Sequence, residues 1–301
     1  MSKLVQCIPN FSEGRRPGVV GAIVDAIASA SAARVIDYTL DADHNRSVVT
    51  FLGSPEDVRR SAVAGARAAV ELIDLNQHAG GHPRIGAVDV IPVVPISDMT
   101  MDEAAAISHD IGRDIFENLR VPVFFYEHSA IIKGRTNLAV IRKGGFEALR
   151  QSGLVGGRKP DLGTELHPTA GAVVVGARGP LIAFNVNLAT TNIHAAREIA
   201  AKIRRLRDSG EGMPGVKAIA VYLKSREIAQ VSTNITLPHL VSIYDVYAFV
   251  QDEAGKMGIE VLESELIGAM REEAAVTALR SAMKLRGLTE ERIIDHWMRS
   301  L

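Results

Sequence analysis

Two successive stretches of the chain show the same order of short apolar runs and amphipathic segments, and this order constrains the fold most strongly. Each strand is expected where a short apolar run is flanked by Gly, Pro or Asp, and each helix where apolar residues recur at helical spacing. Over the first 95 residues the order is strand, helix, strand, strand, helix, strand. We expect these strands at Lys3–Pro9, Arg34–Tyr38, Ser47–Leu52 and Val88–Val94, with helices at Val19–Ala32 and Pro55–Ile73.

The second half of the chain repeats this order without repeating the sequence. Its expected strands are Leu181–Leu188, Val216–Tyr222, Ala229–Ile235 and Glu260–Ser264, with helices at Thr191–Arg207 and Val241–Met257. The order βαββαβ is that of the split βαβ, or ferredoxin-like, fold. We therefore predict an α+β protein of two ferredoxin-like subdomains, residues 1–179 and 180–301, with a cleft between them.

The remaining segments are less regular. Polar residues at the expected helix starts predict N-caps at Ser12, Ser54, Thr100, Thr190 or Thr191, and Thr289. Residues 142–169 hold six glycines and two prolines, which predicts a long loop of the kind that is often functional. Further elements are expected at Asp102–Leu119 (helix), Val121–Phe125 (strand), Phe146–Gln151 (short helix), Ala172–Val175 (strand) and Ala269–Leu301 (two helices broken near Gly287).

Charge and composition exclude several classes of partner. Lys plus Arg number 34 and Asp plus Glu 35, so the basic excess of a nucleic-acid-binding protein is missing. No apolar run approaches the 18 residues of a membrane span, and the first residues lack the apolar core of a signal peptide. We expect a cytoplasmic protein. The single cysteine, Cys7, is expected to be buried on the first strand and to form no disulfide.

His82 is the strongest candidate for chemistry. It lies in a loop with Gly80, Gly81 and Pro83, where the two glycines are expected to end the preceding helix. A histidine on such a loop is suited to general acid–base catalysis near pH 7, although a plain surface histidine fits the pattern as well. His78 precedes it by four residues, but the glycines between them and the lack of a neighbouring Glu argue against zinc, and we predict no metal site.

Three other segments remain open between structural and functional interpretations. The cluster 41–46 is either a solvated turn or a polar rim facing the same pocket as His82. Asn10 and Glu13 either form part of a helix-entry loop or face a ligand. The glycines of 163–171 would let the backbone approach a flat ligand closely, since no phosphate-binding loop is present.

Four runs in matching order, covering nearly the whole chain, resemble the glutamate formiminotransferases. They are VQCIPNFSEG, HAGGHPRIGAVDVIPVVP, GARGPLIAFNVNLAT and AQVSTNI. The resemblance implies two α/β subdomains, a dimer, and transfer of a formimino group from N-formiminoglutamate to N5 of tetrahydrofolate as co-substrate, with release of glutamate. The chain resembles the stand-alone bacterial form of the family, which lacks the cyclodeaminase domain of the animal enzymes. A separate cyclodeaminase is therefore a possible partner.

The resemblance also assigns residues. It places the catalytic histidine at His82, and the folate-contacting segment at Gly163, Thr164, Glu165, Leu166, His167, Pro168, Thr169, Ala170 and Gly171. In that segment the chain is one residue shorter than the family pattern and has Ala170 in place of an aromatic residue. A second departure is Thr39, where the animal enzymes carry an acidic residue two positions after the aspartate that matches Asp37.

The expected chemistry needs one general acid–base and anchors for glutamate. His82 would move the proton between the two amine nitrogens, and Asp37, Asp41 or Asp43 would stabilise the cationic intermediate. Arg46 and Arg84, the arginines nearest in sequence, are the candidates for binding the glutamate carboxylates. Two alternatives stay open: a folate-salvage enzyme acting on 5-formyltetrahydrofolate, and a non-catalytic folate-binding partner of a cyclodeaminase.

Overall fold

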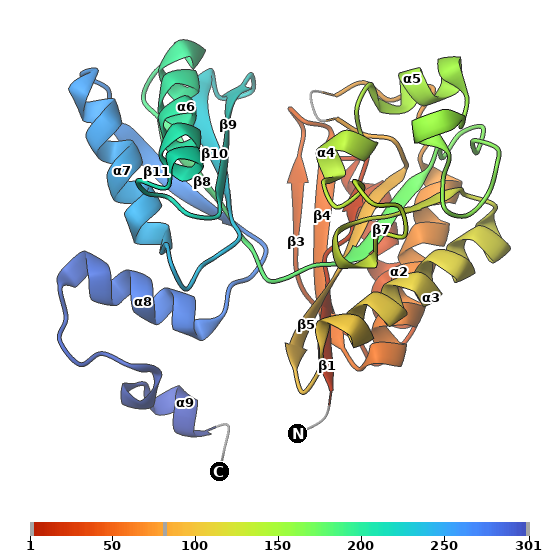
Figure 1. Cartoon of the computed structure of the whole chain (residues 1–301), viewed down its shortest axis with the longest axis horizontal. Coiled ribbons are helices and arrows are strands. Elements are labelled where there is room, and N and C mark those ends of the chain that lie inside the picture. The colour runs from red at the N-terminus through yellow and green to blue at the C-terminus, as the bar shows by residue number, and fades with distance from the viewer. Residues whose placement is uncertain (1–2, 81–82, 299–301) are drawn as a thin grey trace. The chain divides into compact units, whose positions relative to one another are not determined.

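The computed structural model describes residues 3–80 and 83–298, and the chain divides into two compact units, Met1–Gly179 and Pro180–Leu301. Each unit is a β-sheet with helices packed on it (Figure 1). This is the mixed α+β architecture that the element order predicts, and the prediction of an α+β fold is confirmed.

The first unit contains the predicted strands and helices with small shifts at their ends. The strand expected at Lys3–Pro9 ends early, at Cys7, and a separate strand of two residues, β2, follows it; Pro9 lies between the two and has no N–H to donate. The elements are β1 (Leu4–Cys7), β2 (Asn10–Phe11), α1 (Pro17–Ser29), β3 (Arg34–Asp41), β4 (Arg46–Gly53), α2 (Pro55–Leu72), β5 (Val88–Ser97), α3 (Met101–Leu119), β6 (Val123–Phe125) and β7 (Val173–Ala177).

The strand order in this unit is β3, β4, β1 with β2, β5, β7, β6 among the described residues. The first four positions are antiparallel and follow the ferredoxin-like order, while β7 and β6 extend the sheet in parallel to β5. β7 and β8 (Ile182–Leu188) are close in sequence but belong to different sheets.

The two faces of the first sheet are covered differently. A large core joins α1, α2 and α3 to one face, with Ile27, Phe51 and Ile115 fully buried in it. A smaller cluster on Val90 and Val174 includes residues of 138–154, so the segment with α4 (Leu138–Ile141) and α5 (Gly145–Ser152) covers the other face near β5, β7 and β6. The short helix expected at Phe146–Gln151 is therefore confirmed as α5. Single 3₁₀ turns lie at Glu127–Ser129 and Gly156–Arg158.

The second unit reproduces the same strand order in its simplest form. Its sheet runs β11, β8, β10, β9, and every pair is antiparallel. The elements are β8, α6 (Ile193–Ser209), β9 (Val216–Leu223), β10 (Ile228–Ile235), α7 (Ile243–Lys256), β11 (Val261–Ile267), α8 (Glu272–Met283), a 3₁₀ turn (Glu290–Arg292) and α9 (Ile294–Met298). The break expected near Gly287 falls between α8 and the turn.

The predicted helix caps are partly confirmed. The Ser54 side chain accepts a hydrogen bond from Asp57 N, and Thr100 forms a capping box with Glu103. Ser12 is not a cap, because α1 starts later, with Arg16 at the N-cap and Pro17 in the first turn. At α6 the capping side chain is Asn192 rather than Thr190 or Thr191, and Thr289 precedes its turn without a capping hydrogen bond.

Two further sequence expectations concern single residues and hydropathy. Cys7 is fully buried, as expected, and burial raises the pKa of its thiol well above the usual range. Within residues 3–80 and 83–298, none of the helices is both long and apolar enough to cross a membrane.

Candidate functional site

The loop that carries the predicted catalytic histidine starts earlier than expected. The prediction that Gly80 and Gly81 end the preceding helix is wrong, since α2 ends at Leu72 and turns follow it. Gly81 and His82 themselves lie outside the described residues. What the structure describes is how the chain is anchored on both sides of them, at 73–80 and from Pro83 onward.

Asn45 anchors the near side of this loop. Its Nδ2 donates to Ala79 O at 3.0 Å, and its Oδ1 accepts from Gly14 N at 3.0 Å. The His78 Nε2 lies 2.9 Å from Asn45 O, which can only accept, so this ring nitrogen carries the proton. Gly80 permits the close approach, because a Cβ there would lie 2.3 Å from His44 O. The 41–46 turn is thus packed against the loop.

On the far side, the chain is anchored by Arg84 and Asp89. The Arg84 Nη2 donates to His78 O at 3.0 Å and to Glu147 Oε1 at 2.8 Å. The buried Asp89 accepts from Ile85 N at 2.8 Å and forms an ion pair with Arg142. Hydrogen bonds from the 41–46 turn, from β5 and from Glu147 therefore converge on residues 78, 79, 84 and 85.

The predicted folate segment lies directly beside this loop. Leu75 N donates to Thr169 O at 2.9 Å, and Ala87 N donates to Ala170 O at 2.9 Å. Gly86 and Gly171 form an isolated antiparallel bridge, and a Cβ on Gly171 would meet Ile85 O at 2.2 Å. Two segments that the sequence separates by about 90 residues are thus adjacent in the first unit.

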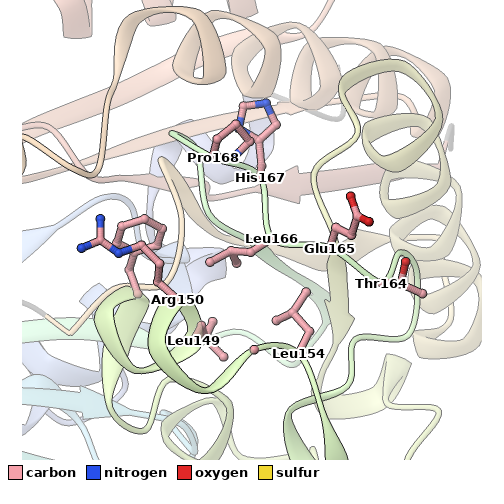
Figure 2. A pocket seen from close by; sticks show the side chains of 10 residues that line it. Leu149, Arg150, Leu154, Thr164, Glu165, Leu166, His167 and Pro168 are labelled. Atoms are coloured by element: carbon pink, nitrogen blue, oxygen red, sulfur yellow. The ribbon is translucent and has the colours of Figure 1, made fainter.

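Part of the predicted folate segment, residues 163–171, lines a pocket of about 280 Å³ (Figure 2). Thr164, Glu165, Leu166, His167 and Pro168 form one side of it, and Leu149, Arg150 and Leu154 lie opposite. Gly163, Thr169, Ala170 and Gly171 are not among its lining residues, and Ala170 is buried in the core instead. The lining combines leucines with polar groups, a composition typical of small-molecule sites.

His167 shapes the end of this segment. Its Nδ1 accepts from Ala170 N at 3.0 Å, while its backbone pairs with Gly171 in both directions at 3.1 Å. Burial lowers the pKa of the His167 ring, and the accepted hydrogen bond requires an unprotonated Nδ1. A neutral His167 therefore holds the tight turn at 167–171.

The register of β3 and β4 settles where the candidate acidic residues point. Asp37, Thr39 and Asp41 pair with Thr50, Val48 and Arg46 in turn, after an irregularity at Ile36. Val35 pairs with Phe51, whose side chain belongs to the helix-side core. Asp37 pairs with Thr50, the residue before Phe51, and successive side chains of a strand point to opposite faces. Asp37 and the alternate residues after it therefore lie on the face opposite the helices. Asp37, Asp41 and Arg46 consequently share the face of the sheet that α1 and α2 leave open.

Asp41 is engaged by its neighbour. Its Oδ1 accepts from His44 N at 2.8 Å, and its Oδ2 lies 2.5 Å from His44 Nδ1. Partial burial acts to raise the pKa of Asp41, but these hydrogen bonds and the charges of His44 and Arg46 outweigh it and lower the pKa. Asp43 lies in the turn between the strands and is half-buried. The choice among Asp37, Asp41 and Asp43 stays open.

Asn10 and Glu13, which the sequence left undecided, have structural roles in this unit. Asn10 forms β2 with Phe11, and its Nδ2 donates to Ile8 O at 2.9 Å. The buried Glu13 accepts from Arg15 N at 2.8 Å and Arg16 N at 2.9 Å, at the start of α1. Although burial opposes it, these hydrogen bonds lower the pKa of Glu13.

Sequence reasoning missed Asp89, Arg142 and Glu147. The ion pairs of these residues join positions that lie 53 and 63 residues apart in the sequence, so no local spacing signals them. A buried Asp within an otherwise apolar strand was the available signal for Asp89. Within the described part of the chain, no three His, Cys, Asp or Glu side chains form a group able to hold a metal ion.

Comparison with known proteins covers both units. Residues 4–178 match the model of the formiminotransferase domain, N-terminal subdomain, and residues 183–296 match that of the formiminotransferase domain. Glutamate formimidoyltransferase of Thermoplasma acidophilum is 39% identical over 98% of this chain and 97% of its own. Its counterpart in Streptococcus pyogenes is 44% identical over 89% of both chains, and formimidoyltransferase-cyclodeaminase of Sus scrofa is 39% identical over 92% of this chain and 52% of its own.

Proposed function

This chain belongs to the formiminotransferase family, and from that membership we propose that it transfers the formimino group of N-formimino-L-glutamate to N5 of tetrahydrofolate, releasing glutamate. The observation that carries this function is the match to stand-alone glutamate formimidoyltransferases over nearly the full length of both chains. The protein is thus a one-carbon transferase, and the reaction belongs to histidine degradation.

The reaction needs few chemical groups. The N5 lone pair attacks the formimino carbon, a bond forms between them, and the bond from that carbon to the glutamate nitrogen then breaks. One proton must leave N5 and one must reach the departing nitrogen. We assign this transfer to His82, since a histidine can give and take a proton near neutral pH, an effect worth roughly 10²–10⁴-fold in rate.

Supporting this assignment, residues on each side of His82 are held by side chains of two separate segments, the 41–46 turn and β5. Asn45 and Asp89 hold Ala79 O and Ile85 N at 3.0 and 2.8 Å. Anchoring of the described flanks matters for the proposal because small displacements of a catalytic group reduce rates strongly. His78 is less suited to the role, since burial lowers its pKa and its Nε2 is held by Asn45 O.

Folate is proposed to contact the 163–171 segment. Leu166, Leu149 and Leu154 offer apolar surface to a ring, while Glu165, His167 and Arg150 offer polar groups at the pocket of about 280 Å³. Such a combination suits a flat aromatic ligand that also needs hydrogen bonds. The adjacency of this segment to loop 75–87 supports placing the reacting N5 near His82.

The glutamate carboxylates are proposed to bind Arg46 and Arg84. Arg46 lies on the open face of the first sheet, opposite Asp41. The Arg84 Nη2 is hydrogen-bonded to His78 O and Glu147, so a substrate carboxylate there would have to displace the exposed Glu147.

Three further properties are proposals that rest on the family. We propose a homodimer located in the cytoplasm. A separate cyclodeaminase would act on the formimino product, since a relative of this chain carries both names in one polypeptide.

A steady-state assay tests the proposed function. Purified protein is mixed with tetrahydrofolate and N-formiminoglutamate without ATP, and the product is converted by acid to the absorbing methenyl form. Turnover under these conditions is expected. Turnover only with 5-formyltetrahydrofolate, or only with ATP, would instead favour folate salvage. Tight folate binding without any turnover would favour the binding partner of a cyclodeaminase.

A further inference from the structure

Asp89 and Arg142 form a buried ion pair beside Arg46, outside the residues considered so far as substrate contacts. The side chains of Arg142 and Asp89 are 13% and 3% exposed. Arg142 follows α4, and Asp89 belongs to β5, so the pair joins the segment that covers the open face to the sheet itself. Arg46 interacts electrostatically with Arg142, Asp89 and Asp41.

An irregularity in β5 aims Asp89 at this face. Asn10 pairs with Val90 and Phe11 with Val88, so Asp89 is an extra residue opposite β2. Val88 contributes to the helix-side core and Val90 to the cluster on the other face. A bulge of this type redirects a side chain, and such bulges are common near active sites.

Arg142 keeps a hydrogen-bond donor that its carboxylate partner does not accept. One Asp89 oxygen accepts from Ile85 N and the other from Arg142 Nη2. Arg142 Nε is buried, and the structure from 3 to 80 and 83 to 298 offers it no partner. Both oxygens of Asp89 are thus engaged, and a buried donor of Arg142 remains for a ligand.

The charges around Arg46 and Arg142 also favour a bound anion. Burial and the positive charge of Arg142 lower the pKa of Arg46 to about 10, against the opposing attraction of Asp89 and Asp41. A second anion placed between the two guanidinium groups would relieve that repulsion. A carboxylate also matches the forked donors of arginine with two parallel hydrogen bonds.

We propose that Arg46 and Arg142, held in place by Asp89, bind a carboxylate of a glutamyl group. Arg142 is thereby a substrate-binding residue and Asp89 a positioning residue. The identification of the anion as glutamyl rests on the proposed function, whereas the anion site itself rests on the geometry. Both substrates of that reaction carry glutamate, so the carboxylate comes from the formimino donor or from the tail of folate.

The test uses Arg46→Gln and Arg142→Gln, with Arg59→Gln as control. Arg59 lies on α2 and is paired with Asp114 at 2.7 and 2.9 Å, so its removal also breaks an arginine–carboxylate pair. Arg142→Lys is added because it keeps a cation beside Asp89 if Arg142→Gln fails to fold. Circular dichroism and melting temperature establish that each variant is folded.

We expect KM for one glutamate-bearing substrate to rise by about 10- to 100-fold in Arg46→Gln and Arg142→Gln, since each variant loses charge-assisted hydrogen bonds. Arg142→Lys should give a smaller rise, and Arg59→Gln none. A rise for formiminoglutamate assigns the donor. A rise for tetrahydrofolate that disappears with tetrahydropteroate, which lacks the glutamate tail, assigns the folate tail.

Unchanged KM values for both substrates in folded Arg46→Gln and Arg142→Gln, or in Arg46→Gln alone if Arg142→Gln does not fold, would overturn the proposal while leaving the proposed function intact. Calorimetric titration with free glutamate separates the opposite case. If the wild-type protein shows no turnover but binds glutamate, and both glutamine variants lose that binding, the anion site stands and the proposed function fails. Equal glutamate binding by wild type and both variants would overturn the proposal independently of turnover.

Discussion

Both units contain the ferredoxin-like strand order, but their sheets carry different polar side chains on the face opposite the main helices. In the first unit the open face carries Arg46, Asp89 and Arg142, and Arg142 keeps a buried donor without a partner among the residues described. In the second unit the corresponding polar side chains form a closed network. The difference shows that one strand order can carry different arrangements of polar side chains.

The closed network of the second unit is centred on Asn187 and Gln230, which are 0% and 3% exposed. Gln230 Nε2 donates to Asn187 Oδ1 at 2.8 Å, and Asn187 Nδ2 donates to Glu265 at 2.8 Å. Glu263 accepts from Asn187 at 3.2 Å and pairs with Arg226. Satisfied networks of this kind fix a single packing arrangement, whereas unsatisfied donors favour binding a ligand.

Of the substitutions considered, the replacement of His82 in the first unit should lower turnover most strongly. We expect His82→Ala to lower turnover by roughly 10²–10⁴-fold, because the variant lacks the group that moves the proton. The exposed His128, in the same unit, provides the control His128→Ala, which should keep wild-type turnover. Steady-state rates and folate binding are measured together. Loss of folate binding along with turnover would make His82 structural instead.

Breaking the network of the second unit should instead affect stability. Gln230→Leu leaves Asn187 Oδ1 without its donor in a buried position, which should cost about 1–3 kcal/mol of unfolding free energy. Asn234→Ala, at an exposed position of the same strand, should cost much less. Urea unfolding compares the two variants. Equal destabilisation would mean that the network contributes nothing specific.

Acid should loosen the first unit before the second. The pKa values of His78 and His167 are lowered from 6.5 mainly by burial, and both residues lie in the first unit. Between the lowered pKa and 6.5 the unfolded chain binds more protons, so stability declines as the pH falls below about 6.5. Carboxylates with lowered pKa, such as Glu13 and Glu253, act only below 4.5.

Amide hydrogen exchange measures which of the two units loses stability as the pH falls. Amide protection, corrected for intrinsic exchange, should fall in residues of the first unit between pH 7 and 5.5 while it persists in β8 and β10. His167→Asn should reduce the fall, because the asparagine side chain does not titrate in this range. A uniform loss of protection across both units would contradict the assignment to these histidines.

The smallest expected effect concerns Arg84. Glu147 is 62% exposed, so Glu147→Gln should change stability by less than about 1 kcal/mol. If Arg84 binds a substrate carboxylate, the variant removes a competing anion, and KM for formiminoglutamate should fall a few-fold. An unchanged KM would restrict Arg84 to anchoring His78 O. Glu56→Gln, which removes a carboxylate paired with Arg59, is the matched control.

The elements that the sequence predicts well are those whose signal is local. Apolar spacing predicts every strand of the second unit, and Ser54 and Thr100 mark their helices because capping involves residues three positions apart. The same kind of local signal is misleading at Ser12, because its hydroxyl donates to Gly86 O, 74 positions away, and does not accept from an N–H at the start of a helix. The early end of the first strand, before Pro9, has the same physical cause as other strand breaks at proline, the missing N–H.

The site could be predicted only where the resemblance or a loop motif marks it. His82 and the 163–171 segment were predicted, but their flanking contacts, such as Leu75 N to Thr169 O, depend on the fold. The pairing of Asp89 with Arg142 requires a bulge in β5 and a segment folded back over the sheet. Neither has a sequence signature, so these charges were found only in the structure.

The most direct measurement follows the transferred carbon. The protein is incubated without ATP with tetrahydrofolate and formiminoglutamate labelled with ¹³C at the formimino carbon, and the products are resolved by NMR. We predict that the label moves to N5 of folate with release of one glutamate for each folate modified. Label that remains on glutamate, or that is released to water while folate stays unmodified, would contradict formimino transfer by this protein.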